Sequence, residues 1–264
     1  MLLFFGGLRR CRVSWINCST LANPSRFVAD QEFDDIRKAA EQGFAVAQWM
    51  LGNAYYDGRG EGVVKDHVEA VNWYRKAAEQ GLAEAQNNLG NAYDLGEGVA
   101  EDEVEAVNWY RKAAEQGLAE AQNHLGNAYD FGEGVAEDEA EAVNWYRKAA
   151  EQGDAEAQNN LGNAYGLGEG VGEDHVEAVK WYRKAAEHGD ATAQFTLGLA
   201  YYLGEGVAKD PVEAYAWISL VAVTTDKTKK ARAVLESMMS AQQVADGQAR
   251  ATALRILIEA ERAK

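Results

Sequence analysis

The chain has 264 residues, with 42 Asp or Glu against 26 Lys or Arg, which gives a formal net charge of −16. This balance excludes non-specific binding to nucleic acid or anionic membranes, because both need a basic surface. A hydrophobic fraction of 47% with only two prolines and two cysteines excludes a Pro-rich disordered chain and a disulfide scaffold. No apolar run approaches the roughly 20 residues that span a bilayer.

Residues 1–30 are predicted to be a disordered or targeting-like segment. Residues 1–29 contain no Asp or Glu and four arginines. The apolar start Met1–Leu8 precedes this charge, whereas a secretory signal has its charge first. An organellar transit peptide and a misassigned start are both open interpretations, and the sequence leaves open a cytoplasmic or an exported location.

Residues 31–222 are predicted to be a repeat domain with a period of 36 residues. Rare residues keep this step, which chance cannot explain. The tryptophans on the period are Trp73, Trp109, Trp145, Trp181 and Trp217. The predicted parts are a half copy at 34–44 and full units at 45–82, 83–118, 119–154, 155–190 and 191–222, called units 1 to 5 below.

Each unit is predicted to be a pair of helices. In the second segment of unit 2, Ala106, Trp109 and Tyr110 share one helix face. Asp102 stands before this segment as an N-cap with Glu105 three residues on, which is the spacing of a capping box. Glycines such as Gly117 follow the second segments, where a positive φ is wanted.

The first segment of unit 2 has its apolar stripe at Ala85, Leu89 and Tyr93, and Gly90 beside it allows close helix approach. The glycine-rich stretch 96–99 supplies the turn to the second segment. A hairpin of this kind cannot bury its apolar face alone, so the units must stack. The sequence therefore predicts an all-α fold, specifically an α-solenoid of helix–turn–helix repeats.

Residues 223–264 are predicted to form C-terminal capping helices, at 227–239 and 241–262. Ser240 and Gln243 have the spacing of a capping box at the start of the second of these helices. The apolar residues expected to cover the last repeat are Val234, Leu235, Met238, Val244, Leu254, Ile256 and Leu257.

The patterns A-E-A-Q-x-x-L-G-x-x-Y-x-x-G-x-G-V and A-x-x-W-Y-x-K-A-A-E-x-G resemble the SEL-1-like repeat, a relative of the tetratricopeptide repeat. The resemblance covers residues 34–222, and the following segment resembles the closing part of many bacterial members. It implies a right-handed superhelix whose first helices line the concave face, and scaffold or adaptor work without catalysis. A cysteine-rich branch of the family is linked to penicillin binding, but no repeat of this chain contains a cysteine.

Asparagines on the first helices are the candidate partner-binding residues. At 100° per residue, Asn87 and Asn91 are predicted to lie opposite the apolar stripe. Asparagine is a poor helix former, so a row of amides that holds an extended peptide explains its presence, and copying of a neutral residue by duplication is the alternative. On the binding hypothesis, Asn→Ala changes leave stability level or raised. The full set is Asn53, Asn87, Asn91, Asn123, Asn127, Asn159 and Asn163.

The matching positions at the two ends are apolar. Unit 1 has Trp49 and Met50 there, and unit 5 has Phe195 and Leu199. They are interpreted either as anchors for a peptide with two hydrophobic residues or as surfaces covered by flanking segments, and the second interpretation is favoured because terminal repeats must hide an open face.

No catalytic residue, metal site or cofactor is predicted. The repeated acids around Glu101 complement the dipole at the start of each second helix, and only their excess points to a basic partner. The glycine-rich stretch 166–172 lacks the spacing and the cations of a phosphate loop. The histidines do not have metal-ligand spacing. They are His67, His124, His175 and His188.

Three functions are compatible with the sequence. The first is a non-catalytic scaffold that binds a protein or peptide in the groove of the first helices. The second is an assembly factor that acts through its acidic edge or by self-association, although a monomer is favoured. The third and most remote is a hydrolase-like activity of the kind claimed for the cysteine-rich branch.

Overall fold

The computed structural model describes residues 30–60, 63–221 and 225–262, so the N-terminal segment discussed above lies outside the described residues apart from Asp30. Thirteen helices make up the described part, and that part contains no strand. The all-α prediction is confirmed.

Five helix pairs match the five units. Helix α1 (Asp30–Glu41) precedes them, and α12 (Asp226–Met238) and α13 (Ala241–Arg262) follow them. The first helices of units 1 to 5 are α2 (Ala45–Asp57), α4 (Ala83–Leu95), α6 (Ala119–Phe131), α8 (Ala155–Leu167) and α10 (Ala191–Leu203). The second helices are α3 (His67–Glu79), α5 (Glu103–Glu115), α7 (Glu139–Glu151), α9 (His175–Glu187) and α11 (Pro211–Val221).

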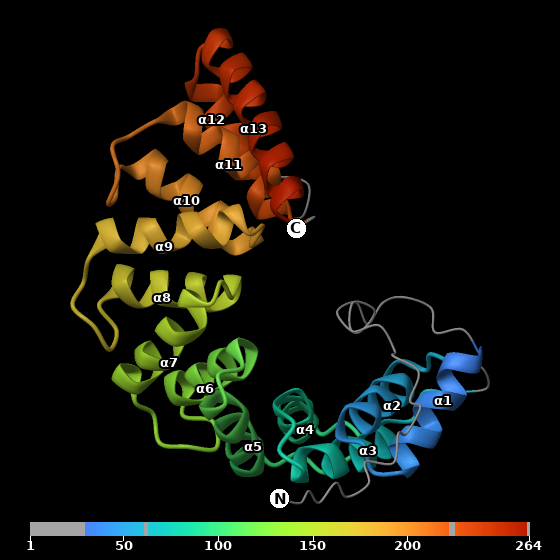
Figure 1. The fold of residues 1–264 in the computed structure, drawn as a ribbon. Helices are drawn as coiled ribbons and strands as arrows, with labels where there is room; N and C mark the ends of the chain where they lie inside the picture. The colour runs from blue at the N-terminus through green and yellow to red at the C-terminus, as the bar shows by residue number, and fades with distance from the viewer. Residues whose placement is uncertain (1–29, 61–62, 222–224, 263–264) are drawn as a thin grey trace, which may run out of the picture.

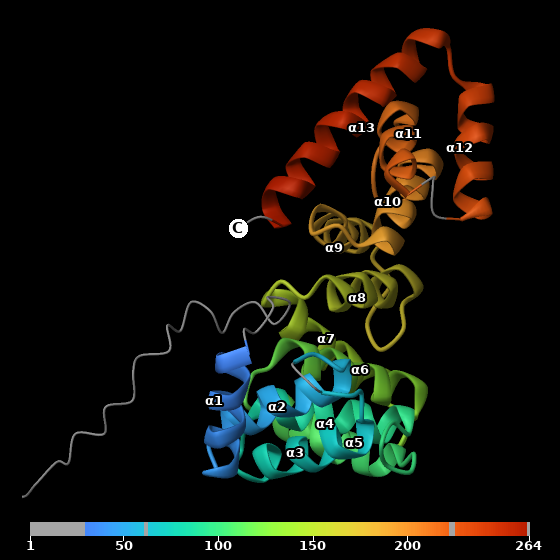
Figure 2. The same ribbon diagram turned by 90° about the vertical axis from the view of Figure 1, so that its right-hand side faces the viewer.

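The helices follow one another in chain order along a curved array, with α1 at one end and α12 and α13 at the other (Figures 1 and 2). The first helices α2, α4 and α6 lie along the inside of the curve, and their partners α3, α5 and α7 lie outside them (Figure 1). This is the α-solenoid that the period predicted.

The helix ends follow the predicted signals. The Asp102 side chain accepts a hydrogen bond from the Glu105 backbone N–H at 3.0 Å, and Asp66, Asp138 and Asp174 repeat this N-cap. The return bond of the predicted capping box is not formed, because the Asp102 backbone N–H donates to the Tyr93 carbonyl at 2.9 Å. The glycines after the second helices have positive φ, which only glycine adopts without strain. These are Gly81, Gly117, Gly153 and Gly189.

Within a unit, the two helices meet where a tyrosine ring lies on a glycine. A Cβ atom added to Gly126 of α6 would lie 2.6 Å from ring carbons of Tyr146 in α7, and Tyr146 is buried. Real carbon atoms do not approach so closely, so this contact requires glycine. The same contact recurs at Gly52, Gly90 and Gly162 with Tyr74, Tyr110 and Tyr182.

The hydrophobic core lies mainly at the junctions between units. Each central cluster joins the second helix of one unit to the first helix of the next, as when residues of α5 pack with Leu125 of α6. The side chain of Trp145 in α7 packs against the same cluster, while the Lys148 ammonium lies 3.4 Å from the centre of its ring. The tryptophan of each unit therefore binds that unit to the junction before it.

Buried glutamines donate to backbone carbonyls at every junction. The Gln122 Nε2 donates to the Ala114 carbonyl at 3.1 Å, near the C-terminal end of α5, and the same carbonyl accepts from the Gly117 backbone N–H at 3.0 Å. Its Oε1 accepts from Gln152 at 2.8 Å. At the same junction, the Arg111 side chain of α5 donates to the Tyr129 hydroxyl of α6 at 3.2 Å. These polar residues hold units in register.

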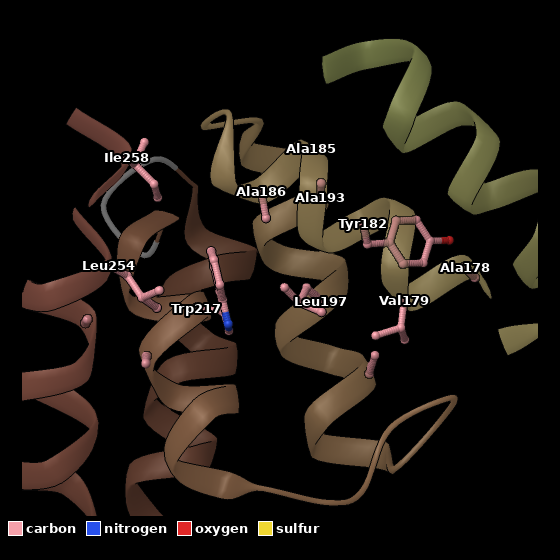
Figure 3. Packing of buried hydrophobic residues seen from close by; sticks show 13 residues of the cluster. Ala178, Val179, Tyr182, Ala185, Ala186, Ala193, Leu197, Trp217, Leu254 and Ile258 are labelled. Atoms are coloured by element: carbon pink, nitrogen blue, oxygen red, sulfur yellow. The ribbon is translucent and has the colours of Figure 1, made fainter. Parts of the chain in front are cut away.

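The C-terminal helices pack on the last units. Leu254 and Ile258 of α13 lie beside Trp217, and Leu197 lies on its other side (Figure 3). Ser240 and Gln243 exchange hydrogen bonds of 2.9 and 3.2 Å, which confirms the capping box at the start of α13. Four of the seven apolar residues expected in this lid are exposed instead, because they lie on the outer faces of α12 and α13. They are Val234, Met238, Ile256 and Leu257.

The glycine–tyrosine contact makes a testable prediction. Gly126→Ala places a methyl group in the Tyr146 ring and is expected to destabilise the chain by about 1–3 kcal/mol, the usual cost of overpacking. The measurement is the midpoint of urea unfolding followed by circular dichroism. Gly172→Ala is the matched control, because a Cβ there meets no atom within 4 Å. Equal midpoints for the two variants would contradict the contact.

Candidate functional site

One stripe of the central first helices faces away from the packed core. In α4 it consists of Glu84, Asn88, Asn91 and Leu95, spaced i, i+4, i+7 and i+11 on one helix face. Its ends are exposed and its two asparagines are half-buried. The equivalent residues of α6 are Glu120, His124, Asn127 and Phe131, and those of α8 are Glu156, Asn160, Asn163 and Leu167. These twelve residues are called the inner face below.

Three of the candidate asparagines do not lie on this face. Asn87, Asn123 and Asn159 were predicted to lie opposite the core, but they are only 1%, 3% and 7% exposed. A first helix touches its own partner and the units on both sides, so its buried arc spans roughly 220° rather than a single stripe. Asn87 lies within this arc, close to Glu120 of the next unit, and His124 and Asn87 together lower the pKa of that carboxyl. The prediction for these three residues was wrong.

The second series of candidate asparagines accepts hydrogen bonds from buried tyrosines. The buried Tyr146 hydroxyl donates to Asn127 Oδ1 at 2.8 Å and to Asp130 at 3.2 Å. Tyr74, Tyr110 and Tyr182 donate in the same way to Asn53, Asn91 and Asn163, at 2.8, 2.8 and 2.9 Å. A buried hydroxyl without an acceptor is costly, so these asparagines have a structural reason to be present.

Unit 5 shows that the asparagine and the tyrosine belong together. At the two equivalent positions it has Leu199 and Ile218, and a Cβ on Gly198 would meet the Ile218 side chain at 2.6 Å. In this repeat an apolar leucine–isoleucine pair therefore replaces the polar asparagine–tyrosine pair at both positions together. Where the hydroxyl is missing, the amide is missing too.

The side-chain amide nitrogens of these asparagines make fewer hydrogen bonds within the fold than the amide oxygens do. The Asn160 Nδ2 lies 3.1 Å from the Oδ1 atoms of both Asn123 and Asn127, so it connects α8 to α6. A side-chain amide atom of Asn88 lies 3.0 Å from Asn53 Oδ1 and 3.2 Å from Trp49 Nε1. The Nδ2 atoms of Asn91, Asn127 and Asn163 remain as donors on the inner face.

The two apolar end positions take part in packing. Trp49 is half-buried against the cluster of α3 and α4. Phe195 packs in a cluster with Leu235 of α12, and the Lys227 ammonium lies 5.1 Å from the centre of its ring. The C-terminal helix α12 thus covers Phe195 of unit 5.

Sequence reasoning missed an exposed apolar row on the inner face. Leu95, Phe131 and Leu167 are 63%, 67% and 66% exposed, and each is the last residue of its first helix. Leu203 continues the row in unit 5. The same 36-residue period marks these positions, but hydrophobicity assigns them to the core.

The predicted acidic cluster has structural uses in part. The Glu103 and Glu139 carboxylates accept from the backbone N–H groups of Gly134 and Gly170 in the next loop, at 3.1 and 2.9 Å. Glu97 accepts from the Tyr56 hydroxyl at 2.7 Å, and this bond raises the pKa of Tyr56. His67 stacks on the Tyr56 ring and lies 3.9 Å from Glu97.

Within the described residues, no group of three or more His, Cys, Asp or Glu side chains is arranged to hold a metal ion. Over the same residues, no helix combines the length and the hydropathy needed to cross a membrane.

The repeat units of this chain match a known protein family. The Sel1 repeat model matches residues 45–82, 83–118, 119–154, 155–190 and 191–220. The chain belongs to the Sel1 repeat family. Sel1 repeat proteins generally mediate protein–protein interactions and are generally non-catalytic.

Two bacterial Sel1-type structures are similar to this chain. The protective antigen c5321 of uropathogenic Escherichia coli is 38% identical, with a TM-score of 0.81 over 88% of this chain and 50% of that one. This chain therefore spans half the length of that relative. A Sel1 repeat protein of Oxalobacter formigenes is also 38% identical, with a TM-score of 0.71 over 81% of this chain and 84% of its own. No curated protein sequence matches this chain significantly.

The tyrosine–asparagine pair predicts a loss of stability that the binding hypothesis alone does not. Asn163→Ala leaves the Tyr182 hydroxyl without this acceptor and is expected to cost about 1–2 kcal/mol in unfolding free energy. The double variant Asn163→Ala/Tyr182→Phe should recover about 1 kcal/mol of that loss. Urea unfolding measures the cycle, with the exposed Asn108→Ala of α5 as control. Additive losses would contradict the pairing.

The buried phenols also predict weakening at alkaline pH. Burial raises the pKa of Tyr182 to about 12 from its ordinary 10.0. A raised folded pKa means that its stabilising contribution is complete below pH about 10 and is lost as the pH rises toward 12. Urea midpoints should therefore fall between these values, and Tyr182→Phe should make that fall shallower. A fall of the same steepness in this variant would contradict the assignment.

Proposed function

We propose that this Sel1 repeat protein is a non-catalytic scaffold that binds a protein or peptide partner along its inner face. The proposal places the partner across α4, α6 and α8. It involves no covalent step, metal or cofactor.

The observation that carries the proposal is the exposed apolar row of Leu95, Phe131 and Leu167. Other repeated residues of the unit have structural uses, since the glycines, tyrosines, glutamines and arginines hold helices and units together. The row makes no such contact and leaves large side chains in water on three neighbouring helices. Exposed apolar side chains that gather on one surface mark interaction sites, and the recurrence of large side chains on three first helices supports a partner surface there.

The neighbouring amides add specificity to such a site. Asn91, Asn127 and Asn163 are half-buried beside the row, and their oxygens are held by tyrosines. Fixed in this way, their Nδ2 atoms are oriented donors that lose little entropy when they bind a backbone carbonyl. Binding thus uses the same asparagines that the fold uses.

The test pans a library of random 15-residue peptides on the full chain. The inner variant is Leu95→Ser/Phe131→Ser/Leu167→Ser. Enriched peptides should bind it at least about tenfold more weakly than wild type, because burying each apolar side chain is worth about 1.5–3 kcal/mol. Fluorescence anisotropy of labelled peptides gives the Kd values.

The matched control is Val68→Ser/Val104→Ser/Val176→Ser. These valines are also exposed, one per unit, at the second position of the second helices. Exposed substitutions change stability little, so both variants should unfold at the wild-type midpoint. The proposal is wrong if no peptide is enriched, or if the enriched peptides bind the inner variant as tightly as wild type.

A further inference from the structure

We infer that the partner segment is a cationic chain in the extended polyproline II conformation, with an apolar side chain at every third residue. This inference rests on the proposed function, because it describes the occupant of the same inner face. It is carried by a separation of charge within the repeat, by the contacts of the basic side chains and by the succession of the first helices.

Charge is segregated within units 2, 3 and 4. Their first helices and following loops, residues 83–102, 119–138 and 155–174, contain 14 Asp or Glu and no Lys or Arg. All seven Lys and Arg residues between positions 83 and 190 belong to the second helices. The layer of first helices and loops therefore holds acids without cations, the outer layer carries the cations, and three of the acids (Glu84, Glu120 and Glu156) lie on the inner face.

The cations of these units are held away from the inner face. The ammonium groups of Lys112, Lys148 and Lys184 lie 3.4–3.7 Å from the centres of tryptophan rings on their own helices. Arg111 and Arg147 donate to tyrosine hydroxyls of the next unit, at 3.2 and 3.1 Å. Both contacts are repeated, so the separation of charge is built into the fold.

The inner acids have no Lys or Arg partner among the described residues. Ion pairs that involve acids of the three first helices and their loops are made with histidines only, as between Glu120 and His124 at 3.8 Å. Glu84 and Glu156 are exposed on the same stripe as the apolar row. Charge complementarity therefore favours a partner rich in Lys or Arg.

The succession of the first helices supports this repeat. Asn160 of α8 touches Asn127 of α6, so these two first helices are neighbours. A chain in the polyproline II conformation has three residues per turn, so every third side chain returns to the same face. Such a chain, laid across the helices, turns one apolar side chain toward the apolar row in each of its turns. An extended chain also leaves its carbonyls free to accept from the Asn91, Asn127 and Asn163 amides, whereas a helix does not.

The probe is a labelled synthetic peptide of four Lys-Lys-Leu repeats, measured by fluorescence anisotropy on the full chain. Two peptides serve as controls: four Glu-Glu-Leu repeats reverse the charge, and four Lys-Lys-Ser repeats remove the apolar side chains. The first peptide should bind at least about tenfold more tightly than either control at 50 mM salt. Its affinity should fall about tenfold by 300 mM salt as the charges are screened.

Two protein variants localise the effect. Glu84→Gln/Glu120→Gln/Glu156→Gln removes three acids from the inner face and should weaken binding of the Lys-Lys-Leu peptide about tenfold. Glu115→Gln/Glu151→Gln/Glu187→Gln removes three exposed acids from the ends of the second helices, with the same change in net charge, and should weaken it less than about twofold. Equal losses in the two variants would overturn the inference, because binding would then follow net charge alone.

The outcomes separate this inference from the proposed function. If library peptides require Leu95, Phe131 and Leu167 but carry no excess of Lys or Arg, the scaffold function stands and the cationic partner is wrong. Equal binding of the Lys-Lys-Leu and Glu-Glu-Leu peptides also overturns the cationic partner. If no peptide depends on the apolar row, both proposals fall together.

Discussion

The contact of a tyrosine ring with a glycine is the constraint on which each repeat depends. Because Gly126 has no side chain, α6 can lie directly on the Tyr146 ring, and the ring in turn is buried. Burial of the ring carries its hydroxyl into the interface, and the hydroxyl then needs an acceptor, which Asn127 supplies at 2.8 Å. One close helix approach thus dictates three residue types.

The junctions between units extend this logic along the array. Apolar clusters supply the stabilisation, and the buried glutamines add a second hydrogen bond to carbonyls at the C-terminal ends of the preceding helices. The Arg111–Tyr129 bond fixes the relative position of two neighbouring units. The apolar row of Leu95, Phe131 and Leu167 belongs to none of these contacts and is exposed on three first helices.

The tertiary structure places the acidic and basic residues of the repeats in different layers. A net charge of −16 says nothing about this distribution, and on sequence alone the repeated acids are explained largely by helix dipoles. In the fold, cation–π contacts and tyrosine bonds keep the basic groups on the outer layer, while the inner layer holds acids beside exposed apolar side chains. A scaffold built in this way selects partners by charge as well as by shape.

The sequence by itself determined the helix pairs, their ends and their stacking. Caps such as Asp102, positive-φ glycines such as Gly117 and the tryptophan period act within a unit or between identical units, so local pattern is sufficient to read them. Only the tertiary structure decided which faces of the first helices remain free. A helix with three neighbours buries a wide arc, which takes Asn87 into the interface and leaves Leu95 in water, against the order that hydrophobicity predicts.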